Sequence, residues 1–183
     1  MSFSVRDKTI LITGASSGIG EHVAYDLSTK GAKLVLCARR VDRLLAVQER
    51  CIELGATQVD VIRVDLGSPD SMDNLVNQLA IKAIDVDVLI NNAGFGHSEP
   101  FISTDFQLVM KLFQVNVLGL MYLTQQLALN LLDQGGGQII NVASLAGKVS
   151  TPNYATYGAT KGAVISFSNA LRMELKPHNI QVT

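Results

Sequence analysis

Two residues with complementary acid–base chemistry, Tyr157 and Lys161, lie four positions apart in a stretch whose pattern predicts a helix over residues 153–176. Positions i and i+4 of a helix share a face, so the phenol and the ammonium would point the same way. A free tyrosine has a pKa near ~10, and a cation held beside a phenol stabilises the phenolate and lowers such a pKa. The pair could then pass a proton to or from a substrate oxygen. The same spacing also occurs on many solvated helix faces, so the rest of the chain has to decide between the two interpretations.

A glycine-rich segment near the N-terminus has the setting of a phosphate-binding turn. It follows an apolar run at 9–12 that predicts a buried strand, and it precedes a predicted helix over 21–30. Backbone N–H groups at a helix N-terminus, together with the helix dipole, favour an anion. The spacing is Gly-x-x-x-Gly-x-Gly, which differs from the Gly-x-Gly-x-x-Gly fingerprint and from a P-loop. A turn that binds nothing is the alternative, and the strand–turn–helix context argues against it. The residues expected to contact a dinucleotide here are Gly14, Ser16, Ser17, Gly18, Ile19 and Gly20.

The second predicted strand, residues 33–37, runs into Arg39 and Arg40 without a carboxylate at its end. In dinucleotide-binding folds an acidic residue there holds the ribose hydroxyls, whereas arginine accommodates a 2′-phosphate. Two guanidinium groups favour a phosphate dianion through charge-assisted hydrogen bonds. The alternative is a solvated arginine pair at the start of the next helix. Beside the glycine-rich turn, the pair favours NADP over NAD.

Strands and helices alternate along the whole chain. Further strands are predicted over residues 58–64, 86–90, 138–142 and 180–183, and further helices over 41–54, 69–83 and 105–133. This alternation predicts one α/β domain, residues 1–183, with a doubly wound, Rossmann-like parallel sheet and helices on both faces. Ligands of such sheets bind at the carboxyl ends of the strands. The polar and loop residues predicted at those ends are Asp65 and Leu66, Asn92, Ala93 and Gly94, and Ser144.

Composition excludes several other classes of function. The net charge is −1, and no basic stripe points to nucleic acid or to an anionic membrane surface. No uncharged apolar run is long enough to span a bilayer, and the N-terminus has no apolar signal segment. Cys37 and Cys51 have no neighbouring metal-ligand partner and predict two reduced thiols, while the histidines lack metal-site spacing. We therefore expect a cytoplasmic protein with no metal site.

With these motifs together, the sequence resembles the short-chain dehydrogenase/reductase family in its main cytosolic branch. Residues 13–20 are similar to the family's Thr-Gly-x-x-x-Gly-x-Gly cofactor loop, and residues 91–94 to its Asn-Asn-Ala-Gly motif. Asn116, Ser144, Tyr157 and Lys161 match the family's catalytic tetrad. The resemblance covers essentially the whole chain.

The resemblance implies a mechanism and a role for each of these side chains. Tyr157 is expected to act as general acid/base on a carbonyl or secondary alcohol, and Ser144 to hold the same oxygen. Lys161 is expected to assist the tyrosine and to bind the nicotinamide ribose, and Asn116 to hold a water that relays protons from Lys161. Asp65 is expected to contact adenine, and Asn92 the adenosine-side ribose region. The implied cofactor is NADP(H).

The resemblance also carries expectations about assembly and length. Family members pair through the two long helices predicted at 105–133 and 153–176, so a homodimer or homotetramer is expected. They also continue beyond the sixth strand into a cofactor loop, a substrate-covering segment and a seventh strand. The chain is therefore expected to lack the final strand and to leave the sixth strand as an open edge.

Two other functions compete with an NADP(H)-dependent oxidoreductase acting on a small carbonyl or alcohol substrate. The first is a non-catalytic protein that binds or senses the cofactor on the same fold, against which the intact Tyr/Lys/Ser/Asn set argues. The second is a sugar-nucleotide epimerase or dehydratase, which usually has different glycine spacing and a larger C-terminal substrate domain.

Overall fold

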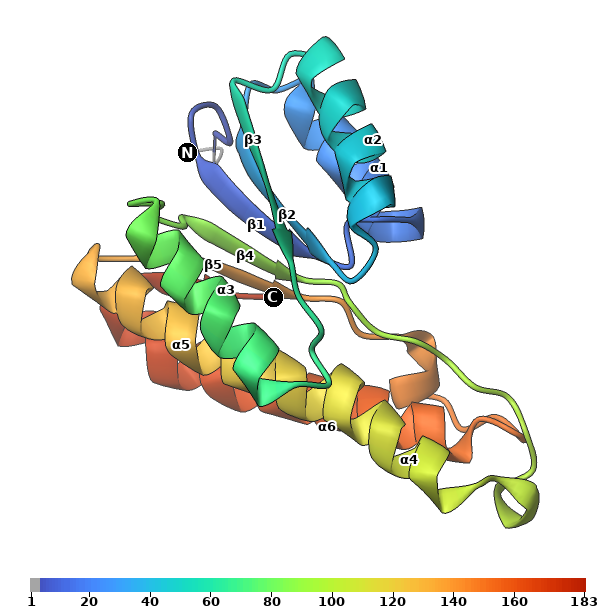
Figure 1. The fold of residues 1–183 in the computed structure, drawn as a ribbon. Helices are drawn as coiled ribbons and strands as arrows, with labels where there is room; N and C mark the ends of the chain where they lie inside the picture. The colour runs from blue at the N-terminus through green and yellow to red at the C-terminus, as the bar shows by residue number, and fades with distance from the viewer. Residues whose placement is uncertain (1–3) are drawn as a thin grey trace.

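A computed structural model describes residues 4–183 as a six-stranded parallel sheet with the strand order β3-β2-β1-β4-β5-β6 (Figure 1). The strands are β1 (Thr9–Thr13), β2 (Lys33–Ala38), β3 (Gln58–Arg63), β4 (Val88–Asn91), β5 (Gly137–Asn141) and β6 (Ile180–Val182). The main helices are α1 (Gly18–Ser28), α2 (Val41–Glu53), α3 (Pro69–Ile81), α4 (Phe106–Phe113), α5 (Leu120–Asp133) and α6 (Ala155–Leu175). Short helical turns are η1 (Phe101–Ser103), η2 (Gln114–Gly119), η3 (Leu145–Gly147) and η4 (Lys176–His178). The strand order is that of the Rossmann fold, which confirms the predicted fold class.

The helices form a layer on each face of the sheet. Figure 1 shows α1 and α2 over one face, and α3, α5 and α6 over the other. Every pair of neighbouring strands is parallel, so each connection between them crosses one face of the sheet. The carboxyl ends of the strands therefore meet along one edge, as the alternation of elements predicted.

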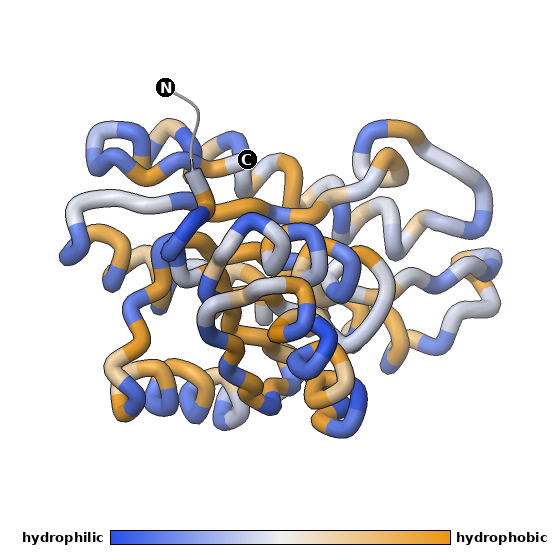
Figure 2. Tube along the Cα trace, turned by 90° about the horizontal axis from the view of Figure 1, so that it is seen from above, coloured by the Kyte–Doolittle hydropathy of each residue, from blue (hydrophilic) through white to orange (hydrophobic). Residues whose placement is uncertain are grey.

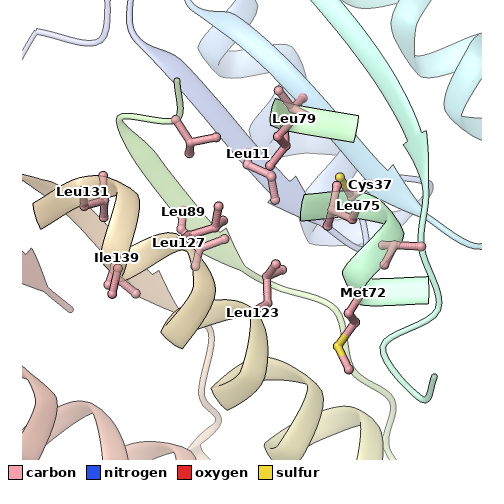
Figure 3. Close-up of a cluster of buried hydrophobic side chains, with 14 of the residues drawn as sticks. Leu11, Cys37, Met72, Leu75, Leu79, Leu89, Leu123, Leu127, Leu131 and Ile139 are labelled. Carbon is pink, nitrogen blue, oxygen red and sulfur yellow. The ribbon is translucent and has the colours of Figure 1, made fainter. Parts of the chain in front are cut away.

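Alternate residues of each central strand supply two separate cores. In β1, Leu11 packs with α3 and α5, whereas Ile10 and Ile12 point to the opposite face and pack with α1 and α2. Figure 3 shows the first of these cores, in which Leu75, Leu123 and other apolar side chains meet over the sheet. Because both faces are covered, the strands are apolar at nearly every position.

The helix predicted over 105–133 is present as Phe106–Asp133, but it is not α-helical throughout. It consists of α4, the π-helical turn η2 and then α5. Gly119 lies at the end of η2, and a Cβ on it would overlap the carbonyl oxygen of Leu66. The chain therefore passes close to the segment after β3, and the wider turn adjusts the helix to it. Such π turns are often found at functional sites, and this one contains Asn116.

Helix ends differ from the prediction mainly at the glycine-rich turn. There α1 begins at Gly18, inside the turn, rather than at residue 21. Ser68 caps α3: its Oγ accepts a hydrogen bond from the backbone N–H of Ser71, and Pro69 is in the first turn. The last predicted helix and strand are found within about two residues of their expected ends.

The stretch Phe106–Asp133 is long and apolar enough to cross a membrane by length and composition alone. The core helix of a folded domain meets the same criterion, and here Leu123, Leu127 and Leu131 pack into the core over the sheet. In Figure 2 blue and orange segments alternate along the outer coils of the molecule, as expected for helices with one apolar face.

Candidate active site

One cleft of about 370 Å³ opens at the carboxyl ends of the strands. Its walls come from the glycine-rich turn, the end of β2, the segments after β3 and β4, η2, the end of β5 and α6. The lining residues are Gly14, Ser16, Ser17, Ile19, Ala38, Arg39, Arg40, Val64, Leu66, Asn92, Ala93, Gly94, Phe95, Gly96, Val115, Val142, Ala143, Tyr157 and Lys161. The proton-transfer pair predicted near residue 160 and the anion site predicted near residue 16 therefore share one cavity.

The glycine-rich turn is held in place by the segment after β4. The side-chain amide of Asn92 donates to the carbonyl oxygens of Thr13 at 2.9 Å and Gly14 at 3.3 Å. Thr13 Oγ1 in turn accepts from the backbone N–H groups of Asn92 and Ala93, both at 3.0 Å. Gly14 adopts a positive φ of 69°, and a Cβ there would lie 2.8 Å from Ala93 Cα. Only glycine fits that position, so the two motifs form one interlocked unit.

The start of α1 points its backbone N–H groups toward the cleft wall that carries Ser16 and Ser17. Ser17 occupies the cap position with extended backbone, and its side chain makes no capping hydrogen bond to the helix. Gly18, with φ +62°, and Ile19 are exposed. The first N–H groups of the helix lie at the end where the dipole favours an anion.

Arg40 closes the same corner of the cleft. Its Nη2 donates to Ser17 Oγ at 2.7 Å and to Ser16 Oγ at 3.1 Å, and both arginines line the cavity. The sequence predicted the Arg39–Arg40 pair at a 2′-phosphate, and of the two it is the Arg40 guanidinium that contacts the serines. Two hydroxyls, a guanidinium and a helix N-terminus together form a site with the chemistry for a phosphate.

At the other end of the cleft, Lys161 is almost fully buried, with 5% of its surface exposed. Its Nζ donates to the carbonyl oxygen of Val142 at 2.7 Å and lies 6.0 Å from the centre of the Tyr157 ring. Burial lowers the pKa of the Lys161 ammonium, because the charged form loses hydration. Tyr157 is only half-buried, so its ring faces the cavity from the same helix face as the lysine.

Asn116 lies behind this pair, within the π turn, and does not line the cleft. Its Oδ1 accepts from the backbone N–H of Phe95 at 3.0 Å, and its Nδ2 donates to the carbonyl oxygen of Phe95 at 2.9 Å. Nδ2 also donates to Thr160 Oγ1 at 3.2 Å. Both ends of the amide are thus engaged by protein. The side chain fastens the loop after β4 to α6.

Ser144 and Asp65 are also placed outside the cleft wall. Ser144 Oγ accepts from the backbone N–H of Ala146 at 3.2 Å and so caps the turn η3. Asp65 Oδ1 accepts from the backbone N–H of Gly67 at 2.9 Å, so one carboxylate oxygen is used in a local turn. Short polar side chains readily form such bonds to nearby backbone, and the sequence alone does not show it. Gly18 and Gly20 similarly shape the turn without lining the cavity.

Several wall residues were not predicted. They are mostly apolar: Ala38, Val64, Phe95, Gly96, Val115, Val142 and Ala143. Most lie within two residues of a predicted strand end or motif. Position next to a strand end is therefore the signal that could have identified them.

Comparison with known proteins gives this cleft a family context. The family model described as "short chain dehydrogenase" matches residues 8–183. The chain belongs to the short-chain dehydrogenase family. The predicted resemblance is confirmed, and the family is one of oxidoreductases.

Individual relatives agree with this assignment. The sequence is 39% identical to "11-beta-hydroxysteroid dehydrogenase-like 4A" of Arabidopsis thaliana over 96% of this chain and 59% of that protein. The structure is similar to L-sorbose reductase from Gluconobacter frateurii complexed with NADPH and L-sorbose, with a TM-score of 0.94, 31% identity, and coverage of 100% of this chain and 69% of that one. It is also similar to a metagenomic short-chain oxidoreductase in complex with NADP, with a TM-score of 0.93, 30% identity, and coverage of 99% and 82%.

The chain spans about three fifths of the length of the curated relatives it matches. The short-chain dehydrogenase architecture from the glycine-rich turn to β6 is nevertheless present in full, with both ends of the cleft built from this chain's residues.

Proposed function

We propose that this short-chain dehydrogenase binds NADP(H) in the cleft and interconverts a small carbonyl compound and a secondary alcohol. One observation carries the proposal: a single cavity joins the Ser16–Ser17–Arg40 corner to Tyr157 and Lys161. A dinucleotide needs a phosphate site at one end and a reaction site at the other. The relatives solved with NADP and NADPH support the same cofactor.

The Arg40 corner supports NADP rather than NAD. A 2′-phosphate there would accept hydrogen bonds from Ser16 Oγ, Ser17 Oγ and the guanidinium, whose Nη2 lies 3.1 Å from the first hydroxyl and 2.7 Å from the second. The two residues directly after β2 are Arg39 and Arg40. The strand end therefore carries no carboxylate that would hold the ribose hydroxyls of NAD.

At the reaction end, the bound nicotinamide supplies or accepts the hydride. Tyr157 donates a proton to the substrate oxygen in carbonyl reduction and accepts it in alcohol oxidation. Lys161, fixed by Val142 O, places a positive charge behind the phenol and favours the phenolate formed when the proton leaves. Ser144 is assigned to the substrate oxygen, because its Oγ accepts from the Ala146 N–H and still has an O–H to donate.

The outer faces of α4, η2, α5 and α6 support a homodimer. These surfaces carry large exposed apolar side chains: Phe106, Met110, Leu118, Leu129 and Met173. Exposed apolar side chains along these helices support the pairing of the two long helices that the family resemblance implies. Sedimentation of the chain at several concentrations tests this proposal. A monomer mass that does not change with concentration contradicts it.

The function is tested by titrating NADPH and NADH into the chain and then measuring turnover on ketones and aldehydes. Tyr157→Phe is expected to abolish turnover and to keep NADPH affinity within about twofold, because the phenol is needed only for proton transfer. Failure of folded protein to bind either cofactor refutes the proposal. Binding without turnover in the unmodified chain would restrict the function to cofactor binding.

A further inference from the structure

A line of buried polar side chains crosses the interior from β4 to α6. Asn91 Nδ2 donates to Asn141 Oδ1 at 2.9 Å, and Asn141 Nδ2 donates to Ser168 Oγ at 2.9 Å. Asn91 Nδ2 also donates to Thr124 Oγ1 on α5 at 2.9 Å. All four side chains are at least nine-tenths buried. Polar groups in a core cost free energy unless they are paired, so an aliphatic residue at these positions would be the simpler choice for stability alone.

The line does not fully satisfy its own members. Asn91 Oδ1 is a buried side-chain polar atom without a hydrogen-bond partner among the residues that the structure describes. A network kept purely for stability would be expected to pair that atom. The network does fix how the elements are placed relative to one another, because the amides of Asn91 and Asn141 each bind partners from two other elements.

Its end on α6 lies next to the proton-transfer pair. Asn141 and Val142 are consecutive at the end of β5, and they bind Ser168 and Lys161 respectively. Lys161 and Ser168 are seven residues apart, which is two helical turns, so they share the face of α6 that meets the sheet. Ser168 Oγ is itself oriented by donating to Val164 O at 2.7 Å, between the two. The helix is therefore fastened to β5 by polar bonds at two points along one face.

The other end of the line lies next to the glycine-rich turn. Asn91 is followed by Asn92, whose side chain holds the carbonyl oxygens of Thr13 and Gly14. Asn92 thus binds the glycine-rich turn at the phosphate end of the cleft, and Asn91 is linked to α6 through Asn141. Asn91 and Asn141 join β4 to β5, and the Asn141–Ser168 and Lys161–Val142 bonds join the end of β5 to α6.

We propose that Asn141 and Ser168 are positioning residues that set α6 against β5, and thereby hold Lys161 Nζ at Val142 O and Tyr157 at the cleft. The proposal rests on the proposed function for its catalytic meaning, but the placement of Lys161 stands on its own. Without the Ser168 bond, α6 is held to β5 through only one of its two polar contacts. The helix can then shift or rotate, and the buried ammonium gains access to water.

Ser168→Ala tests the proposal with a readout that does not depend on turnover. Competitive acetylation with trace acetic anhydride, followed by mass spectrometry of the Lys161 peptide, measures how accessible the amine is. We expect Lys161 to be labelled at least threefold faster in Ser168→Ala than in the unmodified chain. Ser166→Ala is the matched control, because it makes the same change on the exposed side of α6 and is expected to leave the rate unchanged.

General loss of stability is controlled by a variant destabilised elsewhere. Val47→Ala opens the core under α2, on the opposite face of the sheet, without touching α6. The two variants are labelled at temperatures equally far below their own unfolding midpoints. If Lys161 is then labelled no faster in Ser168→Ala than in Val47→Ala, the proposal is wrong. Ser168→Thr, which keeps the hydroxyl, is expected to restore slow labelling. Should Ser168→Ala not fold, Ser168→Cys replaces the hydroxyl by a weaker acceptor of similar size and is judged by the same comparison.

Turnover supplies the second readout. Ser168→Ala is expected to lower kcat at least fivefold with KM and NADPH affinity within twofold, whereas a loss confined to thermal stability contradicts a positioning role. The labelling result, unlike turnover, is independent of the proposed function. If NADPH does not bind at all, the proposed function fails while the labelling comparison still decides whether Ser168 places Lys161.

Discussion

Replacing Arg40 by alanine should convert a chain that prefers NADPH into one that barely distinguishes the two cofactors. The guanidinium lies on Ser17 Oγ at 2.7 Å and Ser16 Oγ at 3.1 Å, so a phosphate at this corner meets all three groups. A hydrogen bond to a charged group contributes ~1.5–3 kcal/mol when well formed. Arg40 is exposed, and solvent screens exposed charges, so the lower end applies. That free energy corresponds to a loss of NADPH affinity of about tenfold.

Fluorescence titration of both cofactors measures the effect directly. NADH lacks the 2′-phosphate, so its affinity for Arg40→Ala is expected to stay within about twofold. Raising the ionic strength should weaken NADPH binding to the unmodified chain more than to the variant, because the charge contact is screened. Arg50→Ala is the matched control: it removes the same charge near the end of α2, where Arg50 pairs with Glu53 on the surface.

Two results would refute the reasoning about Arg40. Equal losses for NADPH and NADH would mean that the guanidinium supports the glycine-rich turn and does not recognise a phosphate. An unchanged NADPH affinity would mean that the Ser16–Ser17–Arg40 corner is a surface hydrogen-bond cluster. In the second case the choice of NADP over NAD would lose its support in this chain.

Three further predictions concern space, packing and charge. Gly96→Leu should lower kcat/KM for bulky ketones at least tenfold while leaving NADPH affinity unchanged, because a Cβ at residue 96 already lies 3.7 Å from Tyr157 Cε2 and a longer side chain fills the space beside the ring. Gly119→Ala should destabilise the fold by ~1–3 kcal/mol in urea unfolding, since the added Cβ overlaps backbone. Lys82→Met should destabilise the fold at neutral pH and have progressively less effect below about pH 4, the ordinary range of an aspartate pKa. Partial burial acts to raise the pKa of Asp60, but hydrogen bonds from Lys82 and Gln58 and the lysine charge lower that pKa overall. The stabilisation from this pair is therefore lost as pH falls and the carboxylate protonates.

Each of these predictions has its own control. Gly96→Ala adds only the Cβ at ordinary contact distance and should change selectivity little; a loss as large as that of the leucine variant would argue for a backbone effect. Gly162→Ala places its Cβ in mid-helix at an ordinary contact distance of 3.5 Å from Gly147 O and should be neutral or stabilising, so equal destabilisation there would remove the packing argument for Gly119. Lys30→Met breaks a fully exposed pair with Asp26, and a pH dependence as strong as that of Lys82→Met would contradict the role of burial.

The local sequence was enough to predict the elements and the edge at which the site forms. Most strands are short apolar, β-branched runs, and most helices end near glycine or proline, so periodicity and turn residues gave the alternation. Alternation implies a parallel sheet, and a parallel sheet gathers the carboxyl ends of its strands. For that reason residues as distant as Gly14, Arg40 and Tyr157 could be assigned to one cleft before any contact was known.

The uses of single polar side chains could not be predicted in the same way. Ser144 caps η3, Asp65 closes a local turn, and Asn116 ties Phe95 to Thr160 instead of facing the cavity. A serine, aspartate or asparagine at a strand end can form any of these bonds. The choice depends on which donor or acceptor the folded chain brings within reach.

The sequence by itself therefore determined the fold class, the family motifs and the edge of the sheet at which the cleft forms, because these follow from local periodicity and from the geometry of parallel sheets. Tertiary structure decided the π turn around Asn116, the choice of Arg40 rather than Arg39 at the serines, and the line from Asn91 through Asn141 to Ser168. Those features join residues far apart in the chain. Their hydrogen bonds exist only at separations near 3 Å, and packing of the whole sheet and its helices sets those separations.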